Sequence, residues 1–250
     1  MDLSTTLYDI FLNQAQKVKI EMLSLGLGYT AVTTSDGGIG LAYTYFGDKK
    51  SCMVLNKDID YEGQAADRLL VKINSANAVE RSMALALINA LNHKNALNLP
   101  EDHDNQIMFD KFNINQGRRV AMVGFFPPLV RVFEKKGVLL EVLDISRGLG
   151  EKKDFYDKLK HWAQVLMLTS TSVLNKSTEE ILANAGQNLK TVMLGPSTPM
   201  VPEAFERLPV HMLAGTVPVD QEQTLKAIRH GMGTPVLHKY SRKVFLELIR

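Results

Sequence analysis

Five apolar runs in the second half of the chain restrict the folds that it can adopt. The runs are VAMVGF (120–125), VLLEVLDI (138–145), AQVLMLTS (163–170), KTVMLG (190–195) and VHMLAG (210–215). Stretches typical of helices or loops separate most of them. Continuous apolar strands that alternate with helices indicate a parallel sheet with both faces covered. We therefore predict an α/β fold in which a ligand binds beyond the carboxyl ends of the strands.

The first half of the chain has a different pattern. Residues 4–16 carry apolar side chains at helical spacing and predict an amphipathic helix. Two β-rich segments flank residues 35–38 (SDGG), where Asp-Gly supplies the positive φ angles of a tight hairpin turn. Residues 62–74 and 78–94 are predicted to be helices, and Asn77 is the expected N-cap of the second.

A polar segment separates these two patterns. Residues 100–117 are rich in Asn and Asp and are the predicted connection between two domains. The expected domains are residues 1–105, an α+β unit, and residues 106–250, the parallel-sheet unit.

Composition excludes several classes of function. Hydrophobic residues make up 45% of the 250 residues and charged residues 22%, as in an ordinary globular protein. The net charge is +2 and no basic run exceeds two residues, so we expect no nucleic-acid partner. Cys52 is the single cysteine, which excludes an internal disulfide and a thiolate metal cluster. Without a signal peptide or a long apolar run, we expect a cytoplasmic protein with no membrane partner.

Bulky side chains follow the first apolar run, where a dinucleotide-binding fold would have G-x-G-x-x-G. Gly124 precedes Phe125, Phe126, Pro127 and Pro128, and the two prolines have no N–H group. We therefore expect no NAD in the usual Rossmann pose. The two phenylalanines either close the top of the sheet or stack on a ligand ring, and both interpretations stay open.

An acid follows the second apolar run. Asp144 lies 20 residues after Gly124, which is the separation at which a dinucleotide fold keeps its ribose-binding acid. Acids after strands are also common as turn or cap residues. The sequence leaves both roles open.

The loop after the third run, residues 169–178, is dense in hydroxyl groups. Ser177 and Glu180 have the spacing of a capping box for the next helix. Capping does not explain Thr171 and Asn175. An asparagine amide donates and accepts hydrogen bonds at once, which suits a heteroatom-rich ligand, although an Asx turn is the alternative.

A second hydroxyl-rich loop follows the fourth run. Gly195 allows a sharp turn, prolines stiffen the loop, and Ser197 and Thr198 present hydroxyl groups. Two such loops at neighbouring strand ends predict a ligand site.

The segments VGFFPPL (123–129), TSTSVLNKST (169–178) and LGPSTPM (194–200) resemble the heavy-metal-chelation family of domain-of-unknown-function proteins. GLAYT (40–44) and NAVERSMALALINAL (77–91) resemble the domain that accompanies it. The resemblance implies an enolase N-terminal-like α+β domain followed by a Rossmann-like parallel-sheet domain. It also implies a ligand site in the cleft between them and a role in handling heavy metals or metal chelates.

The resemblance further implies which residues line the site. Carried over by position, they are Gly124, Phe125, Phe126, Pro127, Thr171, Asn175, Gly195, Ser197, Thr198, Asn77, Arg81 and Asn89.

The residues themselves do not predict a dedicated metal cage. No two of the six histidines have i, i+4 ligand spacing. The cluster at residues 101–104 (EDHD) either holds a hard cation weakly or is a charged, solvated connection. If a metal is involved, we expect it to arrive inside a small chelating molecule or to be held jointly with one.

Three functions fit these observations. The first is a small-molecule-binding protein for heavy-metal chelates or metallocofactor precursors. The alternative is an enzyme acting on a heterocyclic or adenosyl-type ligand at the strand ends. The third is a structural subunit whose cleft binds another protein. The sequence is compatible with a homo-oligomer and does not decide whether the protein is an enzyme.

Overall fold

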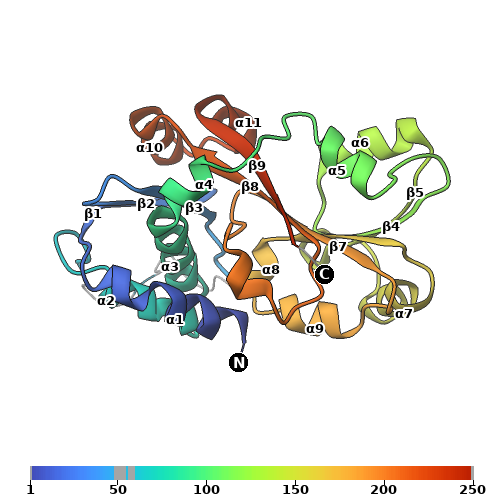
Figure 1. Ribbon diagram of the computed structural model, residues 1–250, viewed down its shortest axis with the longest axis horizontal. Helices are drawn as coiled ribbons and strands as arrows, with labels where there is room; N and C mark the ends of the chain where they lie inside the picture. Colours follow the sequence, from blue (N-terminus) through green and yellow to red (C-terminus); the bar gives the residue numbers. More distant parts are fainter. Residues whose placement is uncertain (1, 48–54, 56–59, 249–250) are drawn as a thin grey trace.

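The computed structural model describes residues 2–47, 55 and 60–248. The chain is a mixed α/β protein with two separate sheets that lie side by side (Figure 1). One sheet has three antiparallel strands and comes from the first half of the chain. The other has six strands and comes from the second half.

The first half contains the predicted helix and hairpin. Its elements are α1 (Leu3–Ala15), β1 (Ile20–Leu25), β2 (Tyr29–Thr34), β3 (Ile39–Tyr43), α2 (Asp67–Leu70), η1 (Val71–Asn74), α3 (Ala78–Leu91) and α4 (His93–Leu97). The turn between β2 and β3 has Gly37 at φ +83°, as the Asp-Gly pair predicts. Helix α3 lies directly on β3, since a Cβ atom on Gly40 would be 2.1 Å from the nitrogen of Ala90.

The helix predicted at residues 62–74 is wrong in its first part. Helix begins only at Asp67, because the preceding residues pair with the sheet. The Gly63 nitrogen donates to the Ile20 oxygen at 2.7 Å, and the Ile20 nitrogen donates to the Gln64 oxygen at 3.0 Å. Main-chain pairing with a distant strand has overridden the local helical pattern.

The six-stranded sheet confirms the five predicted strands and adds a sixth. Its strands are β4 (Arg119–Val123), β5 (Leu139–Leu143), β6 (Val165–Thr169), β7 (Lys190–Leu194), β8 (Met212–Pro218) and β9 (Ser241–Glu247), in the order β5-β4-β6-β7-β8-β9. The first five are parallel, and β9 pairs antiparallel with β8 at the edge. The prediction of a purely parallel sheet was therefore incomplete, because β9 (SRKVFLE) is half polar and lacks the continuous apolar pattern.

Helices cover both faces of this sheet. The helices of the second half are α5 (Gln106–Lys111), α6 (Pro127–Lys136), α7 (Lys152–His161), α8 (Thr171–Leu174), α9 (Thr178–Ala183), α10 (Gln221–Arg229) and α11 (Thr234–Leu237), with short 3-10 turns η2 (Ile145–Arg147), η3 (Pro202–Phe205) and η4 (His238–Tyr240). Of these, α10 and α11 pack against the first sheet instead. Side chains of α5 and α6 share one apolar cluster with the sheet. Side chains of α7 and α9 belong to the cluster on the other face, which continues into the first half of the chain.

The polar segment at residues 100–117 is more ordered than a plain connection. Asp102 caps α5, since its Oδ1 and Oδ2 atoms accept from the nitrogens of Ile107 (3.2 Å) and Met108 (3.0 Å). Glu101 pairs with Arg242 of β9 at 2.7 Å. Two acids of the 101–104 cluster therefore have structural partners.

The chain returns to the first sheet near its end. Leu225 and Ile228 of α10 are buried against Tyr29, Ile39 and Leu41. The first sheet is thus covered by α3 on one face and by α10 on the other. Packing joins α10 to the first half, although this helix lies beyond the predicted boundary at residues 105–106.

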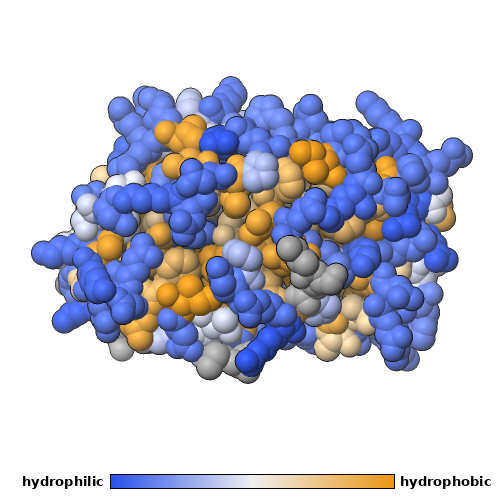
Figure 2. Space-filling model, in the orientation of Figure 1, coloured by the Kyte–Doolittle hydropathy of each residue, from blue (hydrophilic) through white to orange (hydrophobic). Residues whose placement is uncertain are grey.

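The surface of one face is mostly polar, with apolar residues gathered towards its middle, between the two halves (Figure 2). Within the described ranges, no helix is long and apolar enough to cross a membrane.

Candidate functional site at the strand ends

The strand order places a topological switch point between β4 and β6. The chain runs from β4 outward to β5, then returns past β4 to form β6 and continues in the opposite direction. In sheets of this kind, ligands bind in the crevice outside the carboxyl ends of the strands at the switch point. Three loops follow these ends, and we call them the rim: residues 124–127, 169–175 and 195–198.

The rim loops are packed closely against one another. Gly124 has φ +84°, and a Cβ atom there would be 3.0 Å from the Cβ of Thr169. Gly195 has φ +126°, and its Cβ would be 2.7 Å from the Oγ of Ser170. Each position therefore favours glycine for two reasons, the positive φ angle and the lack of room for a Cβ atom.

The side chain of Asp144 holds the loop at 124–127 in place. Asp144 Oδ2 accepts from the Phe125 nitrogen at 3.1 Å, and Oδ1 accepts from the Ser146 hydroxyl at 2.6 Å. Arg147 lies over the Phe125 ring, with its guanidinium carbon 5.5 Å from the ring centre. These contacts give Asp144 a structural role that needs no ribose.

The two phenylalanines of this loop differ in their surroundings. Phe126 packs against the apolar cluster beneath the sheet and precedes α6, whose first residue, Pro127, is exposed. Phe125 is half-buried. Its partner in the described residues is Arg147, so its ring remains the better candidate for ligand stacking.

The loop at 169–175 contains an Asx turn. The Oδ1 atom of exposed Asn175 accepts from the Ser177 nitrogen at 3.1 Å and from its hydroxyl at 2.6 Å. Ser177 consequently makes no side-chain cap on α9, and the predicted capping box is wrong. The Nδ2 group of Asn175 has no partner among the described residues. Thr171 is half-buried and accepts from the Thr169 hydroxyl at 3.2 Å.

The loop at 195–198 is turned inward. Ser197 is 1% exposed, and its hydroxyl oxygen accepts from the Tyr43 nitrogen of β3 at 2.7 Å. Thr198 is 2% exposed and donates to the Gly195 oxygen at 2.8 Å. Both hydroxyl groups are engaged inside the junction between the halves of the protein.

Helix α3 supplies the polar contacts of the first half. Asn77 caps the helix, as predicted, by accepting from the nitrogens of Val79 (2.8 Å) and Glu80 (3.3 Å). Asn89 donates to the Leu41 oxygen at 2.9 Å and to the Ser197 oxygen at 3.4 Å. It thereby ties α3 to both β3 and the rim.

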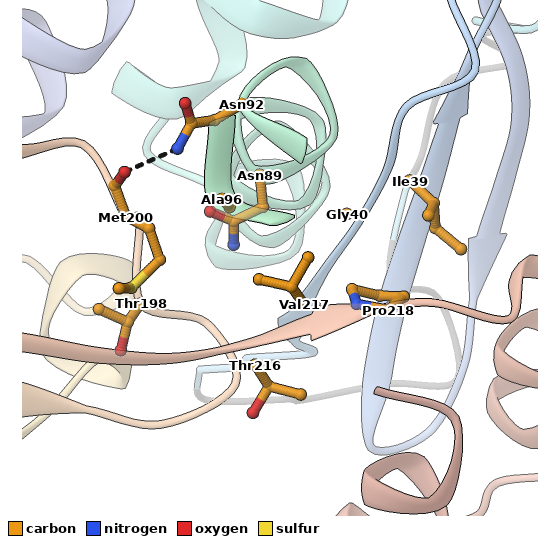
Figure 3. A pocket seen from close by; sticks show the side chains of 10 residues that line it. All are labelled: Ile39, Gly40, Asn89, Asn92, Ala96, Thr198, Met200, Thr216, Val217 and Pro218. Carbon is orange, nitrogen blue, oxygen red and sulfur yellow. Dashed lines mark hydrogen bonds between the residues drawn. The ribbon is translucent and has the colours of Figure 1, made fainter. Parts of the chain in front are cut away.

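Two junction residues were missed from the sequence. Asn92 donates to the Met200 oxygen at 2.7 Å (Figure 3), and His93 Nε2 lies 2.8 Å from the Pro218 oxygen. The signal was their place with Asn89 at i, i+3 and i+4 within the helix predicted at residues 78–94, which the structure divides at Asn92 into α3 and α4. Polar side chains on a buried stripe need partners, and here the second half provides them.

Arg81 is a buried cation at the junction. Its Nε atom donates to the Leu174 oxygen at 2.5 Å, at the end of α8. Its Nη1 atom donates to the oxygens of Ser75 (2.7 Å) and Ala76 (2.8 Å). The side chain is buried, and burial lowers the pKa of Arg81, opposed by the neighbouring Tyr45.

A small cavity lies deeper in the junction (Figure 3). Its lining comes from both halves: Ile39, Gly40, Asn89, Asn92, Ala96, Thr198, Met200, Thr216, Val217 and Pro218. Its volume of about 10 Å³ has room for about one water molecule. This cavity is therefore too small to hold an organic ligand.

The sequence-predicted residues fall into two groups by their burial. The outer group comprises Gly124, Phe125, Phe126, Pro127, Thr171, Asn175 and Gly195. The inner group comprises Ser197, Thr198, Asn89 and Arg81 at the junction, with Asn77 at the exposed start of α3. Among the described residues, no three His, Cys, Asp or Glu side chains form a group that could hold a metal ion.

Known proteins resemble this chain over nearly its whole length. A crystal structure of a protein with unknown function from the DUF364 family of Pyrococcus horikoshii matches with a TM-score of 0.81 and 21% identity, over 98% of this chain and 100% of that chain. A DUF364 protein of unknown function from Desulfitobacterium hafniense matches with a TM-score of 0.76 and 21% identity, over 96% and 97%. An uncharacterized protein of Methanocaldococcus jannaschii is 22% identical, over 92% of this chain and 90% of its own length.

Two family models, both described as "Putative heavy-metal chelation", match the two halves. DUF4213 matches residues 8–92 and DUF364 matches residues 107–247. The second match alone spans more than half of the chain. The chain therefore belongs to the DUF364 family.

Proposed function

We propose that this protein binds small molecules at the rim and handles heavy-metal chelates or metallocofactor precursors. One observation carries the proposal. The loops 124–127 and 169–175 abut at the switch point between β4 and β6, and Arg81 of the first half bonds to the end of the second loop. A ligand at the switch point therefore meets groups positioned by both halves.

The groups at the rim suit the organic part of a chelate. Phe125 offers a ring face, Thr171 a hydroxyl group and Asn175 an amide nitrogen. These neutral groups recognise rings and heteroatoms, whereas heavy metals prefer thiolate and imidazole ligands. In the proposal, the metal is cargo that enters within its chelator, and the family description supports this role.

The inner residues form the wall of this site in the proposal. The hydroxyl groups of Ser197 and Thr198 are occupied by hydrogen bonds within the protein, and Asn89 bridges the two halves. They hold the rim against α3 and do not touch the ligand. Gly124 and Gly195 set the shape of the loops.

The proposal also includes the finer fold assignment. The halves would be an enolase N-terminal-like domain (residues 1–105) and a Rossmann-like domain (residues 106–250) of a cytoplasmic protein. The strand order and the separate family matches at 8–92 and 107–247 support this division. The packing of α10 on the first sheet means that the two domains would be stable only together.

Calorimetric titration and thermal melts test the proposal. The probes are nickel(II), cobalt(II) and iron(III) citrate, the same metals complexed by uncharged chelators, and the bare metal salts. At least one chelate should raise the melting temperature, since a ligand at 100 times its Kd stabilises a protein by about 2.7 kcal/mol. If no chelate binds, or if each bare salt has the same effect as its chelate, the proposal is wrong.

The Asn175→Asp variant tests whether Asn175 contacts the ligand or only forms the turn. The new carboxylate keeps the Oδ1 acceptor for Ser177, removes the Nδ2 donor and adds one negative charge, which the control variant below also adds. Stability should change by less than about 0.5 kcal/mol, while binding of the chelate should weaken by about 1–3 kcal/mol. Asn98→Asp is the matched control, because Asn98 is exposed at the end of α4 with its own local hydrogen bond. Equal affinity of the two variants would end the claim for Asn175.

A further inference from the structure

Arg81 is a buried cation whose acceptors are all neutral. Its side chain is 8% exposed, and its three hydrogen bonds go to main-chain oxygens of Leu174, Ser75 and Ala76. No carboxylate of the described residues forms an ion pair with it. A charge removed from water without a counter-ion is costly, and buried charges are normally paired.

The position of Arg81 adds to this cost. It lies four residues after the Asn77 cap, at the amino end of the 14-residue helix α3. The dipole of a helix is positive at this end and disfavours cations there. The neighbouring acid, Glu80, pairs with Lys72 at 3.1 Å. Neutral carbonyl groups thus orient the guanidinium but leave its charge uncompensated.

Part of the guanidinium has no partner. An arginine has five N–H groups, of which Nε uses one here and Nη1 uses two. The Nη2 group has no partner among the described residues. Two N–H donors of a buried cation therefore have no acceptor among the described residues.

A second cation lies at the same place. Lys176 is exposed and donates to the Asn74 oxygen at 3.3 Å, directly beside the Ser75 and Ala76 carbonyl groups that hold Arg81. Asn175 stands between Lys176 and Leu174 in the chain. The start of α3 and the end of α8 therefore bring two positive charges next to the rim residue that keeps a free amide donor.

We propose that Arg81 binds a carboxylate of the ligand, so that the molecules handled at the rim are anionic, carboxylate-bearing chelators. The inference rests on the proposed function and specifies its ligand class. A carboxylate would supply the missing counter-charge and accept from Nη2, while Lys176 would attract the ligand from solvent. Nε and Nη1 are already fixed by main-chain oxygens, which pre-organises the guanidinium for the anion.

Titration of the full chain with defined probes tests the carboxylate. The probes are metal-free citrate, its uncharged trimethyl ester, nickel(II) citrate and inorganic phosphate. Citrate and nickel citrate should bind, and the ester should bind at least tenfold more weakly because charge-assisted hydrogen bonds are lost. If the ester binds as well as citrate, or if only phosphate binds, the inference is overturned.

Two variants test which side chains bind the carboxylate. Arg81→Lys should weaken citrate binding by about ten- to a hundredfold, because lysine keeps the charge but not the fixed fork. Lys176→Met should weaken it a few-fold and leave the melting temperature unchanged, since Lys176 is exposed. Lys190→Met is the matched control, because Lys190 is exposed at the opposite, amino end of β7. If Arg81→Lys does not fold, Lys176→Met and the ester comparison decide, and unchanged affinity in both overturns the inference.

The same titrations distinguish this inference from the proposed function. If metal complexes of uncharged chelators bind at the rim while citrate and nickel citrate do not, the proposed function stands and the carboxylate contact at Arg81 is wrong. If metal-free citrate binds with the expected dependence on Arg81 and no metal complex binds, the carboxylate contact stands and the metal role fails.

Discussion

The loops after β4 and β7 have similar sequences and opposite surroundings. The first reads GFFPP from Gly124 and the second reads GPSTP from Gly195, each with a positive-φ glycine followed by two prolines. Gly124, Phe125 and Phe126 are half-buried and Pro127 is exposed, whereas Ser197 to Pro199 are buried. The difference shows that a loop's position beside the other half decides whether its side chains face solvent.

The partners of the two loops explain this difference. The loop after β7 meets β3 through the hydrogen bond from Tyr43 to Ser197, and meets α3 through Asn89. The loop after β4 is held by Asp144 and Arg147, which belong to its own half. The second half alone therefore organises one loop, and the other loop is completed by the first half.

The largest expected effect is that of Gly195→Ala. The substitution forces a side chain into φ +126° and places its Cβ 2.7 Å from the Ser170 hydroxyl, so the free energy of unfolding should fall by about 3 kcal/mol. Gly28→Ala should have a much smaller effect, since no atom lies within 4 Å of the added Cβ. Urea denaturation measures both. Similar losses of stability in the two variants would show that glycine at position 195 is not required by the close packing of the rim.

Removing the hydroxyl group that joins the halves should have the next largest effect. Ser197→Ala leaves the Tyr43 nitrogen without its acceptor and should lower the free energy of unfolding by about 1–2 kcal/mol. Ser146→Ala removes the exposed η2 hydroxyl group that donates to Asp144, which holds the other loop, and should change the free energy of unfolding by less than about 0.5 kcal/mol. Equal effects in thermal melts would contradict the contrast between the loops.

A smaller and more local effect is expected from Asp144→Asn. The amide removes the charge that accepts from the Phe125 nitrogen at 3.1 Å and pairs with Arg147 at 3.6 Å. Stability should fall by about 1 kcal/mol, and hydrogen exchange at Phe125 should become faster. The Ser197 region should keep its exchange rate, because it depends on the other half. Faster exchange there would mean that the two loops are coupled.

The smallest change in stability is expected from Phe125→Leu. Phe125 is half-buried, so thermal melts should differ from those of the native chain by less than about 0.5 kcal/mol of stability. If the ring stacks on a ligand, binding of the chelate identified by titration should still weaken about three- to tenfold. A large loss of stability with unchanged binding would instead assign Phe125 to closing the sheet.

Local patterns in the sequence were enough to predict much of the fold. The five apolar runs, the Asp-Gly turn and the Asn77 cap depend on residues close together in the chain, and the structure confirms each of them. The errors in the helix at 62–74 and in the sheet have the opposite origin. Residues 62–66 pair with β1, and the half-polar β9 pairs with β8, so both depend on distant partners.

For the candidate site, the sequence by itself determined which residues stand at the strand ends, because a strand's carboxyl end follows directly from its apolar run. It could not show that Ser197 is buried and bonded to Tyr43 whereas Asn175 is exposed at the rim. Nor could it show that α10 covers the first sheet. These outcomes were decided by the tertiary structure, since burial is set by contacts between residues far apart in the chain.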